Sequence, residues 1–124
     1  EMCIRDRSYI KPFVDKIDQQ VMFAEKSWGS FRVLDIEDES MTIKVTLMPG
    51  HKMNYHSHEH RDEVWTIVQG NGQAILDDEI KDVRPGDVLT MKAGCKHTIA
   101  AVTELKLIEV QLGKEISVKD KIKY

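Results

Sequence analysis

Short segments of β-forming residues follow one another along most of this sequence, and this pattern limits the chain to a few folds. In residues 41–48 apolar side chains alternate with threonine and lysine, which is the period of a strand with one buried face. Turn-forming Pro-Gly pairs at 49–50 and 85–86 separate such segments. Many short strands with regular turns predict an all-β sandwich or barrel. The expected strands are 31–36, 41–48, 63–69, 73–76, 80–83, 87–92, 97–101 and 105–111.

The first 25 residues do not follow this pattern. Residues 1–8 have no periodicity, so we set them aside as a disordered or artefactual leader. From Ile10 to Val21 apolar residues recur at helical spacing, which predicts one amphipathic helix over residues 9–25. The remaining residues, 26–124, have the length of a single β domain.

Three histidines and one glutamate point to a metal site. His56 and His58 form a His-x-His pair, and on an extended segment such a pair presents both rings to one face. Glu63 follows after room for a turn, and His97 opens a later strand. Imidazole nitrogens and carboxylate oxygens suit a divalent first-row transition metal such as Mn, Fe, Co, Ni or Zn. We therefore predict that these four side chains bind one such ion, with His60 in the turn outside the ligand set.

Composition and charge argue against several classes of protein. The net charge of −3, with both signs mixed, gives no electrostatic surface for nucleic acid. No apolar run is long enough to span a membrane, and no charged-then-apolar leader is seen. Cys3 and Cys95 provide no disulfide framework and suit a reducing compartment, so we expect a cytoplasmic location.

The spacing of the predicted ligands resembles that of the cupin family. Residues 50–70 read glycine, five residues, His-x-His, four residues, glutamate, six residues and glycine, which is similar to the first cupin motif without a gap. Residues 86–101 resemble the second motif around His97, although Lys92 replaces the expected proline and Ala101 the expected asparagine. The resemblance implies a double-stranded β-helix, the jelly-roll barrel in which cupins occur.

Three phrases narrow this resemblance. They read Trp-Gly-Ser at 28–30, His-Arg-Asp-Glu-Val-Trp at 60–65 and Ile-Glu-Val-Gln-Leu-Gly at 108–113. Together they look like the C-terminal cupin of type II mannose-6-phosphate isomerases, over about residues 26–118. Val64 stands where that family often has histidine, and His56 where it often has glutamine. The chain therefore has a fuller metal set than many relatives.

The resemblance implies a metal-dependent aldose–ketose isomerase that interconverts mannose 6-phosphate and fructose 6-phosphate. In that family the cupin commonly follows a mannose-1-phosphate guanylyltransferase domain in one bifunctional chain. No glycine-rich nucleotide loop occurs in residues 1–124, so guanylyl transfer would belong to an upstream domain. The helix expected at 9–25 would then correspond to the linker between the two domains. The sequence leaves open whether the chain forms a homodimer.

Six residues are candidates for the chemistry and for substrate binding. By the resemblance, Arg61 and Glu63 are expected to be catalytic; Arg61 offers a guanidinium fork for phosphate or enediolate oxygens, and Glu63 is either a ligand or the proton shuttle. Strand parity with two leucines predicts that Glu109 and Gln111 face the interior, the first as a catalytic residue and the second as a substrate contact. The aromatic rings able to stack on a sugar are Tyr55 and Trp65.

Two other classes of function remain open at this level. The same ligand set serves other cupin metalloenzymes, dioxygenases among them, because ligand type alone does not fix the reaction. A non-catalytic module that binds a metal and a sugar is the second alternative. The sequence therefore leaves open whether the chain is an enzyme, although the resemblance favours an isomerase.

Overall fold

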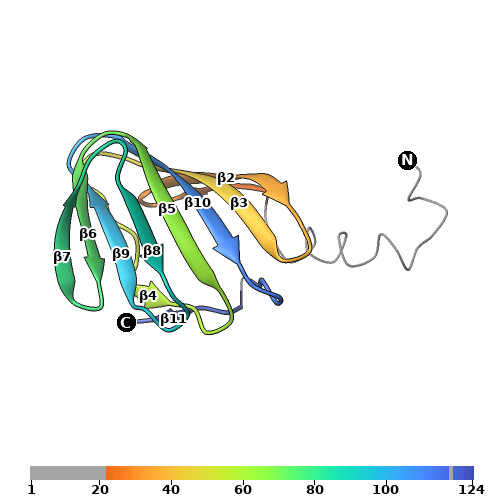
Figure 1. Ribbon diagram of the computed structural model, residues 1–124. Coiled ribbons are helices and arrows are strands. Elements are labelled where there is room, and N and C mark those ends of the chain that lie inside the picture. The colour runs from red at the N-terminus through yellow and green to blue at the C-terminus, as the bar shows by residue number, and fades with distance from the viewer. Residues whose placement is uncertain (1–21, 118) are drawn as a thin grey trace.

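The computed structural model describes residues 22–117 and 119–124, and this part forms two antiparallel sheets stacked as two layers (Figure 1). Within the described residues one sheet has the strand order β1-β2-β3-β10-β5-β8 and the other the order β11-β4-β9-β6-β7. The strands are β1 Phe23–Lys26, β2 Gly29–Ile36, β3 Ser40–Leu47, β4 His56–Ser57, β5 Asp62–Gln69, β6 Gly72–Leu76, β7 Glu79–Val83, β8 Val88–Met91, β9 His97–Ala101, β10 Leu105–Leu112 and β11 Ile122–Lys123. The all-β jelly-roll barrel is therefore confirmed.

The inner faces of the two sheets enclose one hydrophobic core. The alternation read from residues 41–48 is present in β3, where Met41 and Leu47 are fully buried and Lys44 is exposed. Ile67 of β5 and Ile99 of β9 close the core from the two sheets. Each such side chain stabilises the fold by roughly 1.5–3 kcal/mol, so the barrel has a core of its own apart from any bound ion.

The inward face of strand β10 changes from apolar to polar along the strand. It lies between β3 and β5 in the larger sheet. Leu105 and Leu107 belong to the hydrophobic core, whereas Glu109 and Gln111 are buried on the same face further along the strand. The register pairs Gln111 with Glu63 on β5. The inward orientation expected for the polar pair is confirmed, and it places both residues beside a predicted ligand.

The glycine that ends the first motif, Gly70, has a structural role in the backbone. Gly70 follows β5 with a φ of 82°, a conformation that side chains disfavour. A Cβ at this position would lie 2.0 Å from the carbonyl oxygen of Glu104, where the chain enters β10. Gly70 therefore lets two neighbouring strands close tightly at this end of the sheet.

The strands expected after residue 30 agree with the structure to within two residues at each end. The predicted helix is wrong at its C-terminal end, because residues 23–25 lie in β1 and pair with β2. Here Phe23 lies opposite Arg32, whose guanidinium carbon is 4.7 Å from the Phe23 ring centre, so pairing with β2 outweighs the helical periodicity. The rest of that helix, 9–21, and the leader lie outside the described residues. In the described part, the structure has no helix long and apolar enough to cross a membrane.

Candidate metal centre

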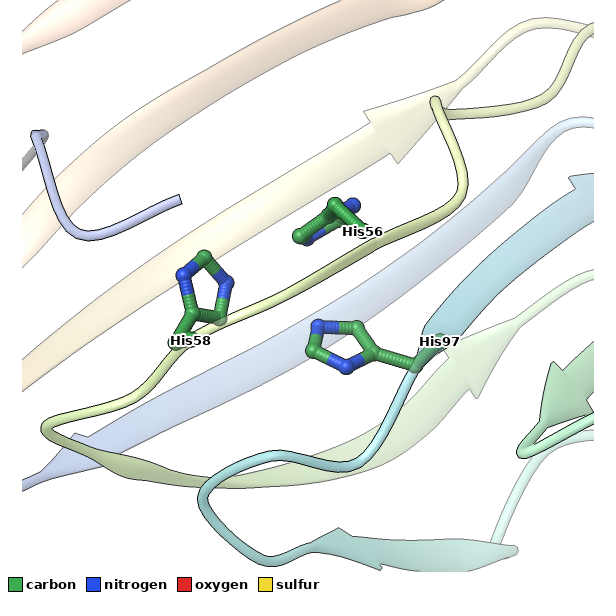
Figure 2. A group of neighbouring side chains, drawn as sticks. All are labelled: His56, His58 and His97. Carbon is green, nitrogen blue, oxygen red and sulfur yellow. The ribbon is translucent and has the colours of Figure 1, made fainter. Parts of the chain in front are cut away.

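Three imidazoles from the smaller sheet meet inside the barrel. His56 begins β4, His58 follows it by two residues, and His97 begins β9, where it pairs with His56. The ring centre of His56 lies 4.3 Å from the ring centre of His97 and 4.9 Å from that of His58. Figure 2 shows the three rings facing one another. One ligand atom from each ring lies within 4.8 Å of the other two, and all three side chains are buried. The His-x-His prediction therefore holds, with the later histidine completing a triad.

The outer nitrogen of each ring is fixed by a backbone carbonyl. Nδ1 of His56 donates to the oxygen of Asn54 at 2.6 Å, and Nδ1 of His97 donates to the oxygen of Cys95 at 2.9 Å. Nδ1 of His58 donates to the oxygen of Asp120. A carbonyl only accepts, so each Nδ1 carries the proton and the neutral ring keeps a free lone pair on Nε2. This is how metal-ligating histidines are usually oriented.

The donor set fits a metal ion. Nε2 of His97 is buried and has no hydrogen-bond partner among the described residues. Such an orphaned acceptor is costly unless a proton donor or a cation fills the place beside it. Two nitrogens bound to one ion at about 2.1 Å can be at most about 4.2 Å apart, so the three ligand atoms, which lie within 4.8 Å of one another, would have to come only slightly closer to share an ion. The geometry therefore supports a metal centre held by imidazoles.

Glu63 lies against this triad from the larger sheet. Its Oε2 is 3.1 Å from Nε2 of His58, and its Oε1 is 3.4 Å from Nε2 of His97. Burial alone would raise the pKa of Glu63, but a proton on the facing nitrogen of either histidine, together with the Arg61 guanidinium, holds that pKa well below its usual value. The carboxylate thus faces Nε2 of His58 and of His97, whereas the ligand atoms that all lie within 4.8 Å of one another belong to the three histidines.

Arg61 closes the other side of the cluster. Its side chain is 8% exposed, and Nε donates to Oε2 of Glu63 at 2.9 Å. Nη1 donates to the oxygen of Ser117 at 3.2 Å, and Nη2 lies 3.1 Å from Nε2 of His58. A guanidinium has five N–H donors, so two remain free after these contacts. A metal ion on His58 would take the lone pair of Nε2 and so leave the Nη2 donor unpaired.

A second buried carboxylate lies deeper along the same interior face. Oε1 of Glu109 accepts from the indole nitrogen of Trp65 at 3.0 Å, and Oε2 accepts from Nε2 of Gln111 at 2.6 Å. Burial, with the charge of Glu63 added, raises the pKa of Glu109 to about 7. The side-chain oxygen of Gln111 is buried and has no hydrogen-bond partner among the described residues. This pair therefore places a carboxyl group with a raised pKa and an unused acceptor beside the imidazoles.

The two aromatic candidates lie elsewhere. Trp65 is fully buried, and its ring meets His97 edge-on with centres 5.4 Å apart, so it packs behind the triad. The hydroxyl of Tyr55 donates to Asp78 at 2.9 Å, and its ring lies against Tyr124. The structure thus brings neither ring to an open face beside the imidazoles. His60 is exposed in the turn, as expected.

Two contributors to the site were not found from the sequence. The carbonyl of Asp120 orients His58, and the carbonyl of Ser117 binds Arg61. Both interactions use backbone oxygens of a segment more than 50 residues away along the chain. Backbone acceptors carry no residue-type signal, so no motif marks them.

His56 gives the metal-free protein a pH-dependent stability. Burial, with His97 added, lowers the pKa of His56 to about 3, whereas the unfolded chain takes up a proton near its ordinary value of 6.5. Below pH 6.5 the unfolded state binds the proton first, so stability is lost as the pH falls. We expect a loss of roughly 2–3 kcal/mol from this group between pH 6.5 and 4.5.

Urea unfolding with a chelator across this pH range checks the expectation. The variant His56→Gln has no such proton to take up, so its free energy of unfolding should fall less steeply with decreasing pH. Parallel curves for the two proteins would contradict the assignment.

Comparison with known proteins agrees with this geometry. The sequence model of the family described as mannose-6-phosphate isomerase C-terminal matches residues 15–124. A mannose-1-phosphate guanylyltransferase of Salmonella muenchen is 30% identical over 100 residues, which cover 79% of this chain and 21% of the relative. One of Escherichia coli is 26% identical over 101 residues, covering 80% and 21%. The chain thus spans about a fifth of the length of these relatives.

Solved structures show the same fold. An RmlC-like cupin from Shewanella frigidimarina superposes with a TM-score of 0.65 at 22% identity, covering 72% of this chain and 81% of that one. Identity at this level supports the architecture alone. With the family match over nearly the whole sequence, the chain has the cupin fold and belongs to the mannose-6-phosphate isomerase C-terminal family.

Proposed function

We propose that this domain binds one divalent first-row transition metal and interconverts mannose 6-phosphate and fructose 6-phosphate, as the C-terminal part of a longer protein that also carries a guanylyltransferase domain. The observation that carries the proposal is the meeting of the three imidazoles with Glu63 and Arg61 inside the barrel. The family match and the names of the relatives supply the substrate class.

The proposed residues divide the chemistry. His56, His58, His97 and Glu63 would hold the ion. When bound, it supplies a Lewis acid that polarises the substrate carbonyl.

We assign the two free N–H groups of Arg61 to the substrate, because a guanidinium binds phosphate or a developing oxyanion through parallel hydrogen bonds. An aldose–ketose conversion also needs a proton moved between adjacent carbons. Glu109 is the proposed carrier, because each of its oxygens keeps a lone pair beyond the bonds from Trp65 and Gln111. Its pKa of about 7 suits both taking up and giving back a proton near neutral pH. The proton would rest on a Glu109 oxygen between the two transfers.

A non-catalytic metal-binding module is the second candidate. The observation that favours it is that the site is closed to solvent. The side chains of His58, Glu63, His97 and Glu109 are each at most 7% exposed. Arg61 already contacts three protein acceptors. In that case the ion would fix the barrel and support a neighbouring domain.

An isomerase assay separates the two candidates. The metal-loaded domain should convert mannose 6-phosphate in a coupled assay, alone or fused to a guanylyltransferase domain, and the metal-stripped domain should not. Oxygen uptake measured in parallel tests for dioxygenase chemistry. Metal-loaded protein that shows no turnover in either form would leave the binding module as the better assignment.

A further inference from the structure

The C-terminal segment, residues 117 and 119–124, lies beside the loop that carries two of the proposed ligands. Strand β11 pairs with β4, with Lys123 opposite His56 and Ile122 opposite Ser57 (Figure 1). The hydroxyl of Tyr124 lies 2.9 Å from that of Ser57. The C-terminal segment therefore lies alongside the chain that starts at His56, the first proposed ligand.

Asp120 makes the most concentrated set of contacts in this segment. Its backbone oxygen accepts from Nδ1 of His58. Its carboxylate accepts from the backbone nitrogens of the next two residues, Oδ1 from Glu59 and Oδ2 from His60, both at 2.8 Å. One residue thus fixes both the ring of His58 and the chain that leaves it. These two bonds also hold the pKa of Asp120 below its usual value, against the effect of burial.

The three imidazoles differ in where their orienting carbonyl comes from. For His56 and His97 the carbonyl lies two residues earlier in the same chain segment, so each ring is oriented locally. For His58 it lies 62 residues later. His58 is therefore the ligand whose orientation depends on the C-terminal segment being in place. Ser117 of the same segment accepts from Arg61, so the dependence extends to the guanidinium.

We propose that Asp120 is a positioning residue for the metal centre, holding His58 in the orientation that presents Nε2 to the ion. The inference rests on the metal site of the proposed function and not on its isomerase activity. Partners that orient a ligand in this way typically contribute a factor of 10–100 in metal affinity.

Three variants of the full chain test the inference through Co²⁺ affinity, measured by competition with a chelator. Asp120→Ala keeps the backbone carbonyl that accepts from His58 but removes both carboxylate bonds that hold this carbonyl against the loop, so it should weaken binding about 10-fold, the lower end of that range. Asp120→Asn keeps one amide oxygen as an acceptor, so it should fall between Asp120→Ala and the wild type. Asp82→Ala is the control, an exposed aspartate on β7 whose carboxylate accepts a hydrogen bond from the side chain of Gln73, and it should bind Co²⁺ like the wild type.

A second readout needs no metal. In ¹⁵N-histidine NMR spectra of the metal-free protein, His58 should show the Nδ1–H tautomer, and Asp120→Ala should mix the two tautomers at this ring alone. Wild-type cobalt affinity in Asp120→Ala, or an unchanged His58 tautomer in that variant, would overturn the positioning role. A wild type that binds no Co²⁺ would refute the metal centre itself, and the tautomer comparison would still decide whether Asp120 orients His58.

Discussion

Replacing His58 with alanine is expected to abolish metal binding and isomerisation together. Sites with four protein ligands bind zinc with about 10–16 kcal/mol, so one ligand of four corresponds to roughly 2.5–4 kcal/mol, which is about 70-fold to 900-fold in affinity. The loss should be greater here, because the substitution also removes Nε2 of His58, which lies 3.1 Å from Oε2 of Glu63 and helps to position this carboxylate. Metal content after dialysis and chelator competition measure the effect.

The neighbouring histidine provides the control for this substitution. His60 lies in the same loop and is exposed, so His60→Ala should keep its metal and its turnover. If His58→Ala bound metal as tightly as the wild type, the ion would have to lie elsewhere and the proposed function would lose its basis.

Replacing Arg61 with alanine should separate chemistry from metal binding. The guanidinium touches a nitrogen of His58 and an oxygen of Glu63 without being a ligand, so its removal should leave metal content within a few-fold of the wild type. Turnover should fall by about 10²–10³, the usual loss when a donor to a developing negative charge is removed. Arg61→Lys retains the charge but not the fork, so partial recovery would indicate charge stabilisation alone.

Steady-state turnover and metal content measured on the same preparations distinguish the outcomes. Arg84→Ala, at an exposed arginine before β8, should leave both quantities unchanged. Parallel loss of metal and turnover in Arg61→Ala would mean that the guanidinium supports the ligands and does not act on the substrate.

The sequence predicts most of the barrel because the alternation of apolar residues is set by the strand itself. In β3 the buried and exposed positions follow directly from the period of two, and in β10 the same rule predicts the inward orientation of Glu109. The rule fails where tertiary pairing decides. Residues 23–25 fit a helical period, yet they pair with β2.

The candidate site was predictable to the extent that it rests on side-chain type and spacing. The histidines at 56 and 58 belong to the first motif and His97 to the second, and the structure brings the three together. Trp65 and Tyr55 are both aromatic and close in sequence to the ligands, but only the fold shows that one packs behind His97 and the other reaches the β6–β7 turn. The contact between His58 and the carbonyl of Asp120 uses a backbone oxygen, which every residue has, so it could not be predicted from the sequence.

The graded inner face of β10 has a consequence for how such a domain can change. Leucines at one end of the strand contribute to the hydrophobic core, and Glu109 and Gln111 at the other end lie beside the metal centre. Substitutions at the polar end can therefore alter which substrate or reaction the barrel serves while the hydrophobic end continues to secure the fold. For laboratory evolution, this separation recommends diversifying positions 109 and 111 first and holding Leu105 and Leu107 constant, so that libraries lose few members to misfolding.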